Sequence, residues 1–245
     1  MSRLAIAAAM LAACNPDPGE LTEQVGYRDG TDGGTTSGER GTIKIAEILW
    51  SGSVTNDGAW DPTDVFVELR NESARSVNIG GWQIQIDGAQ TLTVVLPETD
   101  QLLGVGEQLF IAAKSSGCFP EPDIIAPKLS FPQGDPFSLT LIDKDERLME
   151  TGGDRSMLPF AGGYDSVVSR SMERITLMFG SDGNMPQVWQ YYTGAGEPDA
   201  EGVYKVGGNP NNDKVLASCR KYTLASPGRA NSPDYSGAFA SGSFE

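Results

Sequence analysis

Carboxylates are the side chains of this sequence whose spacing could support chemistry. Asp57, Asp61 and Asp64 lie in one turn-rich loop, and Glu47 and Glu68 lie in the apolar runs on either side of it. Calcium takes about six to eight oxygen ligands from carboxylates, carbonyls and water on such loops. These residues are therefore the candidate ligands of Ca²⁺, the one cofactor that the sequence indicates. The loop lacks EF-hand spacing, and a plain Asp/Gly turn cluster on an acidic surface is the alternative.

The 245-residue chain contains no histidine. Imidazole is the base of Ser-His-Asp and Cys-His catalysis, and most zinc, copper and non-haem iron sites depend on it or on several thiolates. Paired carboxylates can hydrolyse glycosidic bonds, but any acidic β-protein offers such pairs, and no two acids stand out here. The sequence therefore predicts a protein that is not an enzyme, and a carboxylate-based hydrolase is only the third alternative.

Two tryptophans, Trp50 and Trp60, bracket the aspartate loop. If exposed, they could stack on sugar rings while the carboxylates accept hydrogen bonds from hydroxyl groups; otherwise they belong to the core. The formal net charge of −15, without a cluster of Lys and Arg, argues against a nucleic-acid partner. A protein or a polysaccharide is the expected partner.

The segments that must position these residues have the pattern of short β-strands. In 82–87 apolar residues alternate with glutamines, which is typical of a half-buried strand, and in 64–70 Phe66 and Glu68 lie on the face opposite Val67. Further strands are predicted at 42–49, 91–96, 108–114, 137–143 and 171–178. Turn residues separate them and no strong helical stretch occurs, so we predict an all-β antiparallel sandwich or barrel. The stretches 151–168 and 180–212 are predicted to be loops or short excursions from the sandwich.

The start of the chain has an export pattern. Arg3 and a short apolar run precede Leu11-Ala12-Ala13-Cys14; the run is far below the ~20 apolar residues that span a bilayer. This layout resembles a bacterial lipoprotein signal peptide ending in a lipobox. The resemblance implies cleavage before Cys14, acylation of that cysteine with palmitate-type chains and anchoring in a lipid bilayer of the cell envelope. Because Asn15, not Asp, follows the cysteine, the outer membrane is favoured.

With Cys14 acylated, Cys118 and Cys219 remain, an even number in an oxidising compartment. They are predicted to form a disulfide, and two buried free thiols are the alternative. Four regions are expected along the chain: a signal peptide at 1–13, the lipidated cysteine with a flexible tether at 14–40, one folded domain at 41–232 and a disordered tail at 233–245.

A series of motifs follows in order along the folded part, at 45–50, 64–71, 79–82, 103–107, 139–143, 171–174 and 225–231. Their order resembles the lamin tail domain family in its bacterial, secreted form. The resemblance implies an immunoglobulin-like antiparallel β-sandwich that acts as an interaction module. Ala46 stands where the family usually has Asn, and the intervals after 141 and after 174 are long. An inter-strand pair between Glu68 and Arg174 is the expected structural role of these charges.

These observations predict an envelope lipoprotein that presents a non-catalytic, lamin-tail-like domain for structural or binding work. A calcium-dependent adhesion module, or a matrix- or glycan-binding module, is the alternative.

Overall fold

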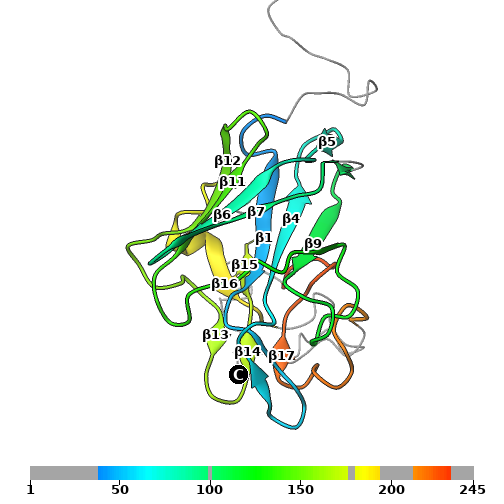
Figure 1. Ribbon diagram of the computed structural model, residues 1–245, viewed down its shortest axis with the longest axis vertical. Helices are drawn as coiled ribbons and strands as arrows, with labels where there is room; N and C mark the ends of the chain where they lie inside the picture. The colour runs from blue at the N-terminus through cyan, green and yellow to red at the C-terminus, as the bar shows by residue number, and fades with distance from the viewer. Residues whose placement is uncertain (1–37, 99–100, 176–179, 194–211, 233–245) are drawn as a thin grey trace, which may run out of the picture. The chain divides into compact units, whose positions relative to one another are not determined.

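The computed structural model describes residues 38–98, 101–175, 180–193 and 212–232, and the account below is of these residues. Their strands form two large sheets and three small ones (Figure 1). The predicted all-β sandwich fold is confirmed. The predicted signal peptide, nearly all of the tether and the predicted C-terminal tail lie outside the described residues.

The larger sheet has six described strands. In spatial order they are β10 (Ile124–Ile125), β9 (Gln108–Ala112), β4 (Phe66–Asn71), β1 (Ile43–Leu49), β15 (Met172–Arg174) and β16 (Trp189–Tyr191). Only the β10–β9 pair is parallel. The smaller sheet is antiparallel and has the order β12 (Leu148–Gly153), β11 (Ser138–Ile142), β6 (Gln83–Asp87) and β7 (Thr91–Val95). Every strand predicted from the sequence is present in one of these two sheets.

Short strands complete the fold. They are β2 (Ser53–Val54) with β3 (Trp60–Asp61), β5 (Val77–Asn78) with β8 (Leu102–Leu103), and β13 (Gly163–Tyr164) with β14 (Ser169–Arg170) and β17 (Thr223–Leu224). Of the two stretches predicted to be loops or short excursions, 151–168 contains the end of β12 and the short strand β13, and 180–212 contains β16 of the larger sheet; residues 194–211 lie outside the described residues. The described helix is one 3₁₀ turn, η2 (Pro186–Val188), and no helix among the described residues has the length and apolarity to cross a bilayer.

The main core lies between the two large sheets. Ile45 and Val67 of the larger sheet belong to the same buried cluster as Ile84 and Leu139 of the smaller one. Trp82, just before β6, is fully buried in this cluster. The alternation seen in the sequence therefore does point apolar side chains from both sheets into one shared interior.

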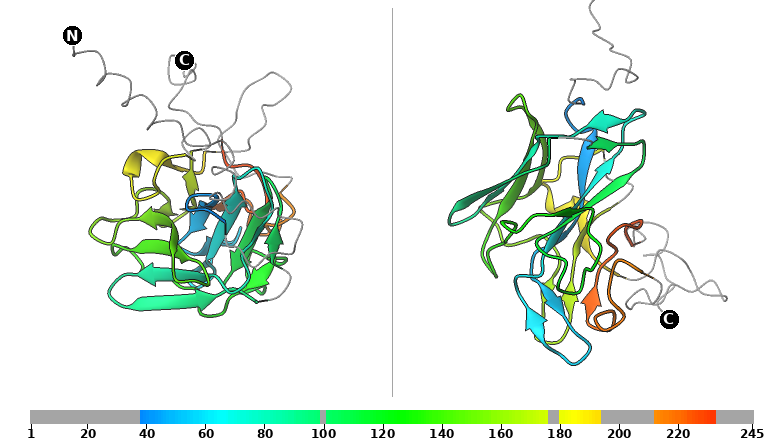
Figure 2. Two further views of the ribbon diagram at one scale, coloured as in Figure 1. Left: turned by 90° about the horizontal axis from the view of Figure 1, so that it is seen from above. Right: turned by 45° about the vertical axis from the view of Figure 1, so that its right-hand side comes forward.

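The outer face of the larger sheet is covered as well. Phe66 and Phe110 project from it and pack edge to face against Phe119, with ring centroids 5.0 to 5.9 Å apart. Val215 and the Cys118–Cys219 disulfide close this second cluster, so the predicted disulfide is present. In the right-hand view of Figure 2, residues 212–232, in orange and red, lie on the side of the larger sheet away from the smaller one.

A β-bulge in β1 decides which face its residues occupy. The pairing of β1 with β4 shifts register between Ile45 and Glu47. In a regular strand these two side chains would point to the same face. Because the bulge inserts an extra residue, Ile45 packs in the core between the sheets while Glu47 reaches residues that cover the outer face.

Candidate functional site

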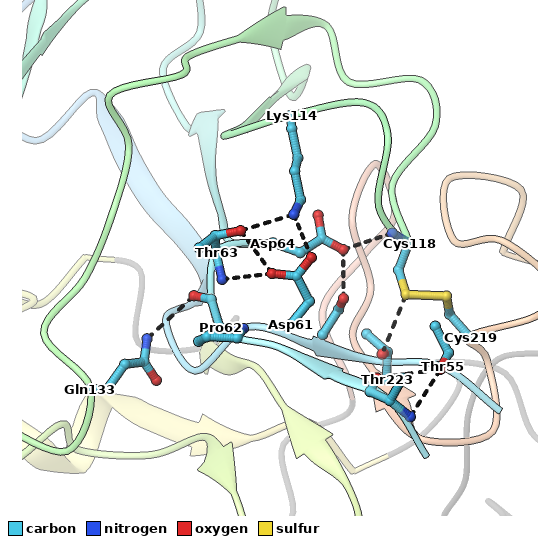
Figure 3. Close-up of polar contacts among 12 residues, drawn as sticks. Thr55, Asp61, Pro62, Thr63, Asp64, Lys114, Cys118, Gln133, Cys219 and Thr223 are labelled. Carbon is cyan, nitrogen blue, oxygen red and sulfur yellow. Dashed lines mark hydrogen bonds and ion pairs between the residues drawn. A yellow bond between two sulfur atoms is a disulfide. The ribbon is translucent and has the colours of Figure 1, made fainter. Parts of the chain in front are cut away.

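A lysine of the same chain, Lys114, forms an ion pair with the aspartate loop (Figure 3). The ammonium of Lys114 lies 2.5 Å from Oδ2 of Asp61 and donates to Thr63 Oγ1 at 2.9 Å. Asp61 also accepts from the main chain and the hydroxyl of Thr63, at 3.0 and 2.7 Å. Partial burial works against ionisation, but Lys114 and Thr63 hold the pKa of Asp61 below its usual value.

Asp64 closes the base of the same loop. Its Oδ2 accepts from Ser53 Oγ at 2.5 Å and from the main-chain N–H of Cys118 at 2.6 Å. A Cβ at Gly117 would come 2.2 Å from this carboxylate, so the contact requires glycine there. Burial raises the pKa of Asp64, against the opposing effect of the two hydrogen bonds. Asp64 therefore ties β2, the start of β4 and the disulfide loop together.

The five residues predicted to bind calcium do not gather at one place: Glu47 and Glu68 lie opposite each other in the larger sheet, away from the aspartates of the loop. Asp57 is exposed and accepts a hydrogen bond from Thr55 within its own turn, whereas Glu47 and Glu68 lie buried in the middle of the larger sheet. In the part of the chain that the structure describes, no three acidic, cysteine or histidine side chains are grouped so as to hold a metal ion. The ammonium group of Lys114 pairs with the negative charge of Asp61 in this loop.

A different set of carboxylates is grouped. Glu47 of β1 lies directly opposite Glu68 of β4 on one side and Glu173 of β15 on the other. All three are fully buried. We call them the glutamate row. Like charges directly opposite each other destabilise a sheet, and a buried charge without partners is costly, so this row needs protons or hydrogen-bond donors.

Residues 225–232, which we call the strap, supply these donors. The main-chain N–H of Ser226 donates to Glu47 at 2.8 Å, that of Ser232 donates to Glu173 at 3.0 Å, and that of Gly228 donates to Glu68. Asn231 donates its side-chain amide to the carbonyls of Ala46 and Arg174, at 2.9 and 2.7 Å. The strap is thus bound along the full width of the row.

Burial is the main influence on the titration of the row. Together with the charge of Glu173 it raises the pKa of Glu47 to about 8, and it raises that of Glu173 to about 7 against the pull of the Ser226 and Ser232 donors. Burial, and next the charge of Glu47, also raise the pKa of Glu68. Removing carboxylates from water favours their neutral form, so the row holds protons in a pH range where exposed glutamates do not.

The expected pair between Glu68 and Arg174 is wrong. Successive residues of β15 point to opposite faces, so Glu173 joins the row and Arg174 points into the sandwich. There its guanidinium lies 3.3 Å from Glu150, which also pairs with Lys44 at 2.9 Å. It also lies over the ring of Trp189, 5.1 Å from the ring centroid.

The two tryptophans that bracket the aspartate loop have different roles. Trp50 is buried and donates its indole N–H to the Ala161 carbonyl at 2.9 Å. Trp60 is 41% exposed; its indole N–H donates to the Ser51 carbonyl at 2.8 Å, and its ring stacks on Tyr164 with centroids 4.7 Å apart. The stacked pair is a rigid aromatic platform at the end of the domain where β13 and β14 lie (Figure 1).

No protein-family model matches this chain, and a search of curated proteins finds no related sequence. The fold and the geometry of the glutamate row, the aspartate loop and the aromatic platform are therefore the basis for the proposals that follow.

The sequence reasoning missed three partners that define these sites. Lys114 and Ser53 complete the aspartate loop, and Ser226 caps the row. One signal was available: glutamates 47, 68 and 173 each interrupt an apolar strand, which is a pattern expected of residues that share a buried polar contact.

Proposed function

We propose that this chain is an envelope lipoprotein, anchored in the outer membrane through acylated Cys14, whose sandwich is a non-catalytic binding domain. We assign the sandwich to the immunoglobulin-like, lamin-tail-like class. The order of sequence motifs supports this assignment, and so do the positions of 64–71, 79–82 and 171–174 in or beside strands of the two large sheets.

The observation that carries the non-catalytic assignment is the use of the acids. Asp61 is paired with Lys114, Asp64 is bound by Ser53 and the Cys118 main chain, and the glutamate row is fully buried beneath the strap. A glycosidase needs two carboxyl groups on either side of a substrate bond in an open cleft. These acids instead stabilise the domain, which favours binding over hydrolysis.

The lipid anchor is tested by cell fractionation of the full chain. Cys14→Ala is expected to move the protein from the membrane to the soluble fraction, because acyl chains, not a spanning helix, provide the proposed attachment. Asn15→Asp is the matched control: it keeps the acylated cysteine, so the protein should stay membrane-bound, with any change confined to which membrane holds it. Membrane retention of the Cys14→Ala protein would refute the anchor.

A specific observation favours a polysaccharide as the partner. Trp60 is 41% exposed and stacks on the partly exposed Tyr164 on a strongly acidic chain, and the next residue of β3, Asp61, pairs with Lys114. The C–H face of a sugar ring stacks on aromatic rings while polar neighbours bind its hydroxyl groups. A neutral or basic glycan fits this surface, since an acidic one would meet the net negative charge.

The platform is tested by measuring binding of the purified full chain to glycans isolated from its own envelope. Trp60→Ala is expected to weaken binding at least about tenfold, a loss of about 1.4 kcal/mol, because it removes the stacking surface. Tyr191→Ala is the matched control, since Tyr191 is also exposed, at 53%, but lies on edge strand β16. Equal binding by both variants and the unchanged protein would exclude the platform as the glycan site.

A further inference from the structure

The hydroxyl of Ser226 shows that the closed strap needs a proton. Its Oγ lies 3.1 Å from Oε2 of Glu47 and 2.5 Å from Oε1 of Glu173. A serine hydroxyl has one proton to donate. It can therefore donate to one of these two carboxyl groups but not to both, and a protonated second carboxyl completes the contact by donating to the hydroxyl.

The remaining oxygens of the pair do not remove this requirement. Oε1 of Glu47 accepts from the Ser226 main chain, and Oε2 of Glu173 accepts from that of Ser232. With a proton on Glu47, one chain of hydrogen bonds satisfies every atom: Glu47 donates to Ser226 Oγ, and Ser226 donates to ionised Glu173. The 2.5 Å separation on the Glu173 side agrees with a hydroxyl donating to a charged carboxylate.

The charges around the pair favour retention of that proton. Glu68 faces Glu47 from the next strand and itself feels the charge of Asp123. Cations of the surrounding elements pair with other acids: Arg70 with Glu72 at 2.5 Å, Arg174 with Glu150 at 3.3 Å, Arg229 with Asp213 at 3.4 Å and Lys214 with Asp123 at 3.6 Å. The neighbouring groups with the largest effects on the pKa values of Glu47 and Glu173 are a carboxylate and neutral donors: Glu173 and the hydroxyl of Ser171 for Glu47, and Ser226, Ser232 and Gln190 for Glu173.

The direction of the pH effect follows from the raised pKa values. A carboxyl whose pKa is higher in the folded state than its usual 4.5 contributes stability that is complete below about pH 4.5. That contribution is lost as the pH rises through the folded-state values, about 7 for Glu173 and about 8 for Glu47. The contribution therefore declines progressively between about pH 4.5 and about pH 8, and it is fully lost above the folded-state values.

We propose that the strap is a proton-operated latch, closed while the Glu47–Glu173 pair holds one proton in addition to the hydroxyl proton of Ser226, and opened when that carboxyl proton is lost to solvent. Opening breaks the hydrogen bonds from the strap main chain and admits water to the glutamate row. The Cys118–Cys219 disulfide lies just before the strap and holds the preceding chain on the sheet. Opening is therefore local, and it uncovers the outer-face cluster beside Ala225.

Hydrogen exchange of the purified full chain, followed by mass spectrometry, tests the latch. After correction for the intrinsic pH dependence of exchange, protection of the strap amides is expected to fall as the pH rises from about 5 to about 8, by up to about tenfold per pH unit for each proton that opening releases, and to level off above about pH 8. The segment of β6 serves as the internal reference and should keep its protection. Strap protection that is constant with pH, or that falls equally in β6, would overturn the proposal.

Glutamine variants identify the proton that matters. In Glu47→Gln the side-chain amide donates permanently to Ser226 Oγ, so the pH-dependent loss of strap protection should be clearly smaller than in the unchanged protein; Glu68, which Gly228 of the strap also caps, still titrates. In Glu173→Gln the amide donates to Ser226 Oγ and the hydroxyl donates to ionised Glu47, so the hydrogen-bond chain runs in the opposite direction and the pH dependence should shrink in the same way. This second variant keeps the test available if Glu47→Gln fails to fold. Glu98→Gln, at an exposed position, is the matched control and should behave like the unchanged protein. If strap protection in both Glu47→Gln and Glu173→Gln falls with pH as much as in the unchanged protein, the latch proposal is contradicted.

Discussion

Trp82→Ala is expected to lower the free energy of unfolding by about 3–5 kcal/mol, the range for deleting a fully buried large aromatic side chain. Trp82 has no exposed surface and lies in the cluster shared by the two large sheets, directly before β6. Little of the cavity can be refilled, because strands on both sides are fixed by their ladders. Equilibrium denaturation in urea, with the slope of the transition checked for constancy, gives the change directly.

Trp60→Ala is the matched control for this prediction. It deletes the same side chain at a position that is 41% exposed, so its cost should be clearly smaller than that of Trp82→Ala. A Trp82→Ala protein within about 1 kcal/mol of the unchanged one would mean that the core between the sheets is organised differently from this structure.

Removal of the disulfide is the second large effect. Cys118 and Cys219 are 101 positions apart, and in the chain-entropy model a loop of this length contributes up to about 4.7 kcal/mol. Replacing both cysteines by serine is expected to lower the free energy of unfolding by about 2–5 kcal/mol. Both residues are only 1% exposed, so the serine hydroxyls would also be placed in an apolar cluster.

Reduction of the unchanged protein separates these contributions. The cross-link is lost without a new polar group, so the loss of stability after reduction should be the same or smaller than in the double serine variant. Because the sulfur atoms are buried, native-state reduction should require partial opening and proceed slowly. Complete reduction, verified by thiol alkylation and mass measurement, with an unchanged melting temperature would contradict the prediction.

Alternation along single strands made much of the sandwich predictable. The period of two in 82–87 places Ile84 in the core, and that in 64–70 separates Phe66 from Val67, as the two clusters show. These are local properties, since each strand carries its own pattern of burial. The very short strands, such as β13 and β16, contain too few residues to show a period, and they pair only because longer strands place them.

The glutamate row depends on features that a sequence pattern does not contain. Regular alternation would put Glu47 on the same face as Ile45, and only the bulge in β1 turns it to the outer face. Ser226 then contacts Glu47 across 179 positions, and Lys114 reaches Asp61 across 53. Contacts of this kind are set by the packing of whole segments, so residue spacing in the aspartate loop could not show that Lys114 pairs with Asp61.

The position of β1 has a consequence for how the molecule is made. This early strand is central in its sheet, pairing with β4 but also with β15, and its Glu47 is capped by the strap. A nascent chain that has reached only β11 holds one of these three partners, β4. Contacts so distant along the chain make folding slow, so we expect the domain to acquire its native structure after residue 232 has emerged. Until then β1 keeps an unpaired edge, which makes the partly synthesised chain dependent on protection from aggregation.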